Sequence, residues 1–160
     1  MKHSAISKGQ EVHWRELQIS SPAFLSDDYI PSRFTCDGLN VSPPLDIDKI
    51  PKDAKSFVLI VDDPDAPNGT YVHWIVWNIP IKHHLKENEV PGIEGRNDFG
   101  QNHYGGPCPP NGRRHRYFFK INALDSLLQL PPETTKEQLE QTMGEYVIAF
   151  GELVGVYQRQ

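Results

Sequence analysis

Short apolar runs, each bounded by proline, glycine or other turn-forming residues, divide this chain into segments. Four runs are rich in β-branched and aromatic residues and predict strands over 56–61, 72–79, 116–124 and 146–157. Within the last run, Gly151 and Gly155 indicate a bulge or bend. Most of the ordered chain is therefore expected to be β-structure.

The run 72–79 is apolar at both sets of alternating positions. Strict alternation puts Tyr71, His73, Ile75 and Trp77 on one face, and Trp74 and Val76 on the other. Because both faces are apolar, this strand is expected to lie in the middle of a sheet and to be buried on both sides.

One segment, residues 132–144, has the pattern of a helix. Thr134 is a candidate N-cap and Glu137 follows it three positions later, which is the spacing of a capping box. Leu139 and Met143 share a face, and Gly144 is a plausible stop. The predicted fold class is therefore mainly β: an antiparallel β-sandwich with one or two short helices.

The chain has 160 residues, 38% of them hydrophobic and 23% charged, which is typical of a globular protein. This length predicts a single domain over 1–160, with residues 1–18 as a loose N-terminal arm. The net charge of −5 argues against a nucleic-acid-binding surface. The stretch "MKHSAISKGQEVHW" lacks the apolar core of a signal peptide, and no run is long enough to span a bilayer. We therefore expect a cytoplasmic protein without a transmembrane segment.

Cys36 and Cys108 are the two cysteines of the chain. In a reducing compartment the default state is two thiols rather than a disulfide. Both lie in loops, so a bridge is possible if their Cα atoms come within about 5.5–6 Å. No histidine stands at zinc-finger spacing from them, and no structural zinc site is expected.

The stretch "VDDPDAPNG", residues 61–69, is the first place where chemistry could gather. It joins two predicted strands through so short a loop that they should pair as a hairpin, which brings Asp63 near His73. The alternative is a solvated acidic turn, since aspartate and proline are common in turns. His73 itself could equally be a core histidine with a satisfied hydrogen bond.

The stretch "GGPCPPNGRRHRY", residues 105–117, is the second place. Its glycines would let backbone N–H groups approach a ligand closely, and its prolines stiffen the loop. His115 and Tyr117 then point the same way at the start of a strand. These features suit a small pre-formed anion pocket, although a rigid structural loop would have the same sequence.

Taken together, these motifs resemble the phosphatidylethanolamine-binding protein family, which includes the Raf kinase inhibitor protein. The stretches "FTCDG", "SFVLIVDDPDAP", "VHWIVWNIP" and "GGPCPPNG" followed by "HRYFFKINALD" carry the resemblance over about residues 24–158. The likeness is greatest to the bacterial and archaeal branch. The loop before His73 is shorter than in the mammalian members, and their long C-terminal helix has no counterpart.

The resemblance implies a non-enzymatic binding protein whose pocket takes a phosphate or a phospholipid head group, with no cofactor. The ligand-binding residues it implies are Asp63, Asp65, Pro67, His73, Gly106, Pro107, Cys108, Pro110, His115 and Tyr117. Asp63 beside the two pocket histidines would favour their protonated form. A kinase or protease is the protein partner to consider, as a target of inhibition, and the bacterial branch also admits a homodimer.

Two other readings stay open. Asp63, His73 and His115 have the composition of a facial metal triad, so a metal-dependent enzyme is one alternative. The chain contains no HExxH metal motif and no GxSxG nucleophile motif, which weighs against it. The other alternative is a protein-interaction scaffold with a vestigial pocket.

Overall fold

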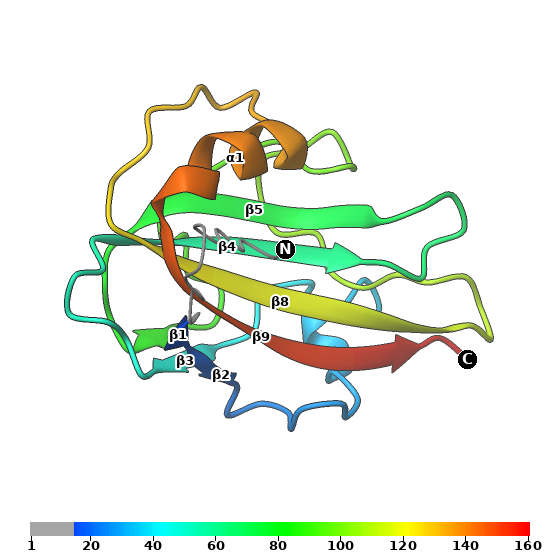
Figure 1. The fold of residues 1–160 in the computed structure, drawn as a ribbon. Coiled ribbons are helices and arrows are strands. Elements are labelled where there is room, and N and C mark those ends of the chain that lie inside the picture. Colours follow the sequence, from blue (N-terminus) through cyan, green and yellow to red (C-terminus); the bar gives the residue numbers. More distant parts are fainter. Residues whose placement is uncertain (1–14) are drawn as a thin grey trace, which may run out of the picture.

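The computed structural model describes residues 15–160 and is organised around a twisted six-stranded sheet (Figure 1). The spatial order of its strands is β1-β9-β8-β4-β5-β7. They are β1 (Arg15–Glu16), β4 (Ser56–Asp63), β5 (Tyr71–Ile79), β7 (Ile93–Glu94), β8 (Arg114–Leu124) and β9 (Val147–Gln158). Neighbours pair antiparallel, except β1 and β9, which are parallel. The four predicted strands are confirmed, with ends shifted by one or two residues.

A second sheet of three strands packs against one face of the large sheet. It contains β2 (Gln18–Ser20), β3 (Leu45–Asp48) and β6 (His84–Leu85), in the order β2-β3-β6. Alternate residues of β4, including Phe57 and Leu59, form the main core with residues of the small sheet such as Ile47. The mainly-β sandwich is therefore confirmed. Residues 1–14 of the expected loose arm lie outside the described residues. For residues 15–18 the expectation is wrong, because β1 pairs with β9 and Gln18 belongs to β2.

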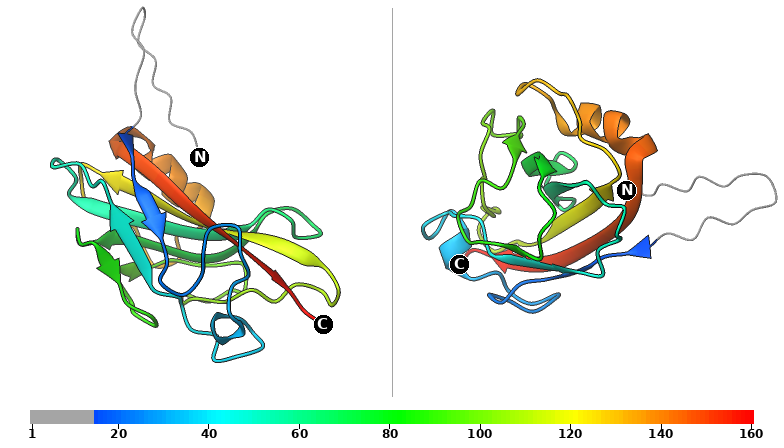
Figure 2. Two further views of the ribbon diagram at one scale, coloured as in Figure 1. Left: turned by 90° about the horizontal axis from the view of Figure 1, so that it is seen from below. Right: turned by 90° about the vertical axis from the view of Figure 1, so that its left-hand side faces the viewer.

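The opposite face of the large sheet is partly covered by the helix α1 (Lys136–Met143), as Figure 2 shows from two sides. Leu139 and Met143 are fully buried there against Val58 and Trp77. Two short 3-10 turns, η1 (Ser32–Phe34) and η2 (Gly144–Tyr146), complete the helical structure of residues 15–160. No helix in this described part of the chain is long and apolar enough to cross a membrane.

The cap of α1 lies one residue later than the sequence pattern indicated. Thr135, not Thr134, is the N-cap, and Gln138 completes the capping box in place of Glu137. The hydroxyl of Thr134 instead donates a hydrogen bond to the carbonyl of Pro131. Two adjacent threonines, each followed three residues later by Glu or Gln, offer two registers for the same motif, and the sequence does not choose between them.

Strand β5 carries an extra residue at His73. Val61 of β4 pairs with Trp74 and Asp62 pairs with Val72, so His73 has no partner on β4 and forms a β-bulge. The bulge changes which residues share a face. Tyr71 and His73 lie on the main-core side together with Trp74 and Val76, while Val72, Ile75 and Trp77 face α1. The expected strict alternation is therefore wrong across this residue.

Cys36 and Cys108 form a disulfide, with 5.4 Å between their Cα atoms. The expectation of two free thiols is wrong. That expectation followed from an assumed reducing compartment, not from the positions of the two loops. The bond joins the loop after η1 to the loop before β8, across a sequence separation of 72 residues.

Candidate functional site

A pocket of about 230 Å³ lies where the end of β4, the beginning of β5 and the beginning of β8 meet the loop before β8. Its walls are mostly proline and aromatic side chains, and its polar groups are few. The lining residues are Asp63, Ala66, Pro67, Tyr71, His73, Phe99, Cys108, Pro109, Pro110, His115 and Tyr117. These come from five separate segments. The two antiparallel pairings of β4 bring the ends of β4, β5 and β8 together, and the loop with Phe99 is attached to β5 through Asn97.

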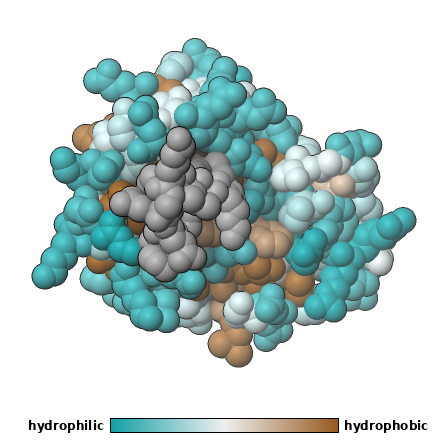
Figure 3. All heavy atoms as spheres, in the orientation of Figure 1, coloured by the Kyte–Doolittle hydropathy of each residue, from teal (hydrophilic) through white to brown (hydrophobic). Residues whose placement is uncertain are grey.

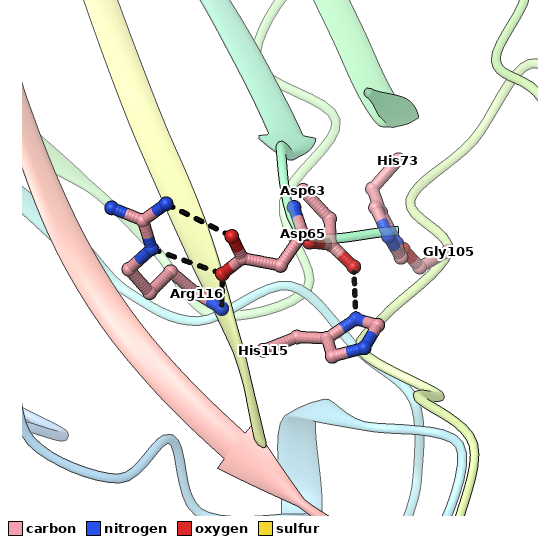
Figure 4. A network of polar contacts seen from close by, with 6 residues as sticks. All are labelled: Asp63, Asp65, His73, Gly105, His115 and Arg116. Atoms are coloured by element: carbon pink, nitrogen blue, oxygen red, sulfur yellow. Dashed lines mark hydrogen bonds and ion pairs between the residues drawn. The ribbon is translucent and has the colours of Figure 1, made fainter. Parts of the chain in front are cut away.

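Asp63 and His115 form a buried pair in this pocket (Figure 4). The Nδ1 atom of His115 lies 2.7 Å from the Oδ2 atom of Asp63, and both side chains are less than a tenth exposed. The other carboxylate oxygen of Asp63 accepts a hydrogen bond from the backbone N–H of Asp65 at 2.8 Å. With Nδ1 engaged, His115 has its Nε2 atom left for a ligand.

His73 is held by the loop before β8 rather than by Asp63. Its Nδ1 atom lies 2.7 Å from the carbonyl oxygen of Gly105, and the Gly105 N–H donates to the His73 carbonyl. Since a carbonyl can only accept, Nδ1 carries the proton. Burial lowers the pKa of His73 below its ordinary value, although Gly105 and Asp63 oppose this effect. Asp63 thus acts on His73 in the expected direction, but burial outweighs it and the net shift favours the neutral imidazole, whose Nε2 atom is a hydrogen-bond acceptor.

Aromatic rings surround His73. The rings of Tyr71, Phe99 and Tyr117 stand edge-on to its imidazole, with centroids 5.3, 5.4 and 5.3 Å away. Tyr117 is almost completely buried. Burial, together with the negative charge of Asp63, raises the pKa of its phenol, which therefore stays a neutral hydroxyl at physiological pH. The pocket thus combines an apolar wall with a small number of hydrogen-bonding groups.

The loop before β8 is fastened from behind by the segment 34–40. The Gly106 N–H donates to Asn40 Oδ1 at 2.8 Å, the Cys36 N–H donates to the carbonyl of Pro107, and the disulfide completes the attachment. The backbone donors of Gly105 and Gly106 are thus already used. The expectation that these glycines offer free N–H groups to a ligand is wrong. A Cβ at Gly106 would lie 2.3 Å from the carbonyl oxygen of Phe34, which explains why glycine is needed there.

Of the ten sequence-predicted site residues, seven line the pocket and three do not. Asp65 points away and forms a two-pronged ion pair with Arg116, whose hydrogen bond is the main reason that the pKa of Asp65 is lowered. Gly106 and Pro107 lie behind the rim. Sequence reasoning missed four lining residues: Ala66, Tyr71, Phe99 and Pro109.

The sequence contains a signal for one of the missed residues, Tyr71, and none for another, Phe99. Tyr71 stands two positions before His73. The alternation of the strand already put it on the same face as His73, so its place in the pocket wall could have been predicted. Phe99 belongs to a distant loop that Asn97 organises: the Asn97 side chain donates to the His73 and His103 carbonyls and accepts from the N–H groups of Phe99 and Gln101. No sequence signal connects that loop to His73.

The three candidate metal ligands do not form a ligand cluster. Asp63 is hydrogen-bonded to His115, and His73 is hydrogen-bonded to Gly105. Across residues 15–160, no group of three or more His, Cys, Asp or Glu side chains is placed to hold a metal ion. The geometry therefore gives no support to the metal-triad alternative.

Comparison with known proteins agrees with the motifs. The family model described as phosphatidylethanolamine-binding protein matches residues 20–158. A "UPF0098 protein" of Pyrococcus abyssi is 50% identical over 150 residues, covering 88% of this chain and 84% of its own length. A second, from Methanothermobacter thermautotrophicus, is 44% identical, covering 89% of this chain and 99% of the relative.

Solved structures show the same likeness. A phosphatidylethanolamine-binding protein homologue of Chlamydia trachomatis superposes with a TM-score of 0.87 at 39% identity, covering 91% of this chain and 99% of that one. YbcL of E. coli, described as a new member of the mammalian family, gives a TM-score of 0.84 at 30% identity over the same shares. This chain belongs to the phosphatidylethanolamine-binding protein family.

Proposed function

We propose that the chain is a non-enzymatic binding protein that takes a small anion, a phosphate or a phosphorylated head group, into the pocket around Asp63, His73 and His115. The observation that carries the proposal is the orientation of the two imidazoles. Each has its Nδ1 atom engaged, by Asp63 in one case and by Gly105 in the other, and each keeps its Nε2 atom available. The volume of about 230 Å³ lies below the usual range for drug-sized ligands and suits a head group.

The charge of the pocket limits which anion it can take. Within residues 15–160, no lysine or arginine lines it, and Asp63 is its one carboxylate. A positive charge on His115 would be balanced by Asp63, so the pocket offers hydrogen bonds rather than net positive charge. A monoanion is therefore favoured over a dianion. A protonated phosphate oxygen would also give the Nε2 atom of His73 a donor.

The lining residues of the described chain offer neither a serine or threonine hydroxyl nor a free thiol as a nucleophile. The sulfur of Cys108 is bonded to Cys36. Binding without chemistry is therefore the function that this set of side chains supports best. Inhibition of a kinase or protease, self-association as a homodimer and a cytoplasmic location all stay predictions. The disulfide does not decide the location, because intracellular proteins of hyperthermophiles also contain such bonds.

Calorimetric titration with inorganic phosphate and phosphoethanolamine tests the proposal. The second pKa of a phosphomonoester is about 6, so binding should be tighter near pH 6 than near pH 8, where the dianion dominates. Sulfate has no proton to donate at either pH and should bind more weakly than phosphate near pH 6. Binding should be lost in His115→Ala and kept in His84→Ala, an exposed histidine hydrogen-bonded to Asp46 outside the pocket. No binding of either phosphate by a correctly folded protein would contradict the proposal.

A further inference from the structure

A second and larger hollow lies beside the pocket. It is on the same face of the large sheet as α1, in the part of that face that the helix does not reach. Its volume is about 580 Å³, and three arginines line it together with two aspartates and a valine. We call it the arginine groove and define it by Asp27, Asp65, Arg113, Arg114, Arg116 and Val156. His115 touches both hollows, but none of these six residues lines the pocket.

The topology gathers these arginines on one side of the sheet. Arg114 and Arg116 alternate with the pocket residues His115 and Tyr117 along β8, so their side chains leave the opposite face. Arg116 pairs across the ladder with Val156 of β9. Figure 1 shows α1 over β5, away from the end where β8 begins. Within residues 15–160, α1 therefore does not cover the part of the sheet where these arginines stand, and all three are exposed.

The groove is positively charged on a chain that is negatively charged overall. Its three arginines exceed its two aspartates by one, whereas the whole chain carries −5. Asp65 already binds Arg116 through two hydrogen bonds of 2.9 Å. Within residues 15–160, neither Arg113 nor Arg114 makes an ion pair, and both are exposed. Two arginine side chains are therefore available to a partner's carboxylates.

Apolar and aromatic surface accompanies this charge. The Arg114 guanidinium lies 5.5 Å from the ring centroid of Tyr29, which is 47% exposed, and Arg116 lies 5.5 Å from that of Phe118. Phe118 and its ladder partner Val154 are half-buried. Figure 3 shows a hydrophobic patch over β8 and β9, bordered by hydrophilic side chains. Arginine and tyrosine around an apolar centre are the residues that dominate binding energy in protein interfaces.

We propose that the arginine groove is a docking surface for an acidic segment of a partner protein. Carboxylates of the segment pair with Arg113 and Arg114, and an apolar side chain of the segment rests near Val156 and Phe118. The volume, more than twice that of the pocket, and the open apolar surface fit a chain segment better than a single small anion. This inference is independent of the anion-binding function, because the unpaired arginines do not line the pocket.

An NMR titration of the ¹⁵N-labelled protein with the peptide acetyl-Glu-Glu-Leu-Glu-Glu-amide tests the proposal. Amide signals of residues 27–29, 113–118 and 154–156 should shift. The counterpart with lysine in place of glutamate should cause no shifts. Reversing Arg113 and Arg114 together to glutamate should weaken binding about tenfold, since two exposed ion pairs are removed and replaced by repulsion.

A matched control separates a local site from net charge. Reversing Lys52 and Lys55 to glutamate changes the total charge equally, but at the far end of the sheet, where β4 begins. This variant should bind the peptide like the parent chain. Phosphate binding in the pocket should be unchanged in both double variants, so that failure of the groove and failure of the pocket give different results.

Three results would overturn the proposal. One is an absence of peptide-induced shifts in the folded protein. Another is an equal loss of binding in the two double variants, which would indicate attraction by net charge alone. The third is binding to phosphatidylglycerol vesicles through Arg113 and Arg114 that is tighter than peptide binding, because the face would then be a membrane contact.

Discussion

Removing the disulfide should destabilise the protein substantially while leaving its native structure in place. The perturbation is the double substitution Cys36→Ser and Cys108→Ser, or reduction of the parent chain. The bond closes a loop of 72 residues. For that loop length, the chain-entropy relation gives about 15 cal/mol/K of lost freedom in the unfolded chain, or about 4 kcal/mol at room temperature. At this chain length such a loss corresponds to a Tm lower by roughly 12 °C.

The structure explains why the native state should survive. Without the bond, the Tyr104 hydroxyl still donates to the Phe34 carbonyl at 2.7 Å, and the Gly106 N–H still donates to Asn40. These contacts hold the loop before β8 against the segment 34–40. The cost should therefore appear in the unfolded chain, which gains freedom, and not as a rearranged pocket.

Urea unfolding of the oxidised chain, the reduced chain and the double serine variant measures this effect. The oxidised chain should be more stable by about 4 kcal/mol. The denaturant slope should increase once the bond is removed, because a freer unfolded chain exposes more surface. Reductant should not change the serine variant. If thiol labelling proves full reduction and yet stability changes by less than about 1 kcal/mol, the chain-entropy argument is wrong for this protein.

Three further predictions rest on single groups. The pKa of His73 in the folded chain lies below its ordinary value of 6.5, so the unfolded chain binds more protons as the pH falls. The contribution of His73 to stability should therefore be complete above pH 6.5 and be lost below it. His73→Gln should remove that part of the pH dependence of unfolding. Gly106→Ala should strongly reduce the thermal midpoint, because the new Cβ would lie 2.3 Å from a backbone carbonyl oxygen. Gly144→Ala is the control: Gly144 has open space around it and a helical φ of −51°, so this change should be neutral or stabilise by about 0.5 kcal/mol. Asp62→Asn should lower the free energy of unfolding in urea more than Asp65→Asn does. Asp62 is 1% exposed and pairs with two lysines, whereas the exposed Asp65–Arg116 pair should contribute at most about 1 kcal/mol. Equal losses in the two variants would contradict this argument.

The fold was largely available from the sequence because its central strands are long, apolar and bounded by turns. β4, β5, β8 and β9 each span eight or more residues, and the pattern located them all. The strands β1, β6 and β7 have two residues each, too few to show a period. They form only because neighbouring strands present unpaired backbone groups.

The site was predicted in outline because sequence motifs mark strand ends, where side chains gather. Asp63, His73 and His115 come together as expected, but the sequence did not indicate which of the two histidines Asp63 binds. The histidine bound to Asp63 is His115, and His73 is bound by Gly105. Which partner each imidazole takes depends on the bulge in β5 and on the loop fastened to Asn40, and both are tertiary features without a local pattern.

His73 is the extra residue of the bulge in β5 and is not needed for the pairing of β5 with β4. Val72 and Trp74 already pair with consecutive residues of β4, so the sheet would close without it. A single-codon deletion at this position would leave the strand pairing regular while removing an imidazole from the pocket. The reverse insertion would create the imidazole on a sheet that already exists. Binding capacity at this position can thus be gained or lost in one evolutionary step that keeps β4 paired with β5, although Gly105 and Asn97, which donate to the His73 carbonyl, would need a new acceptor.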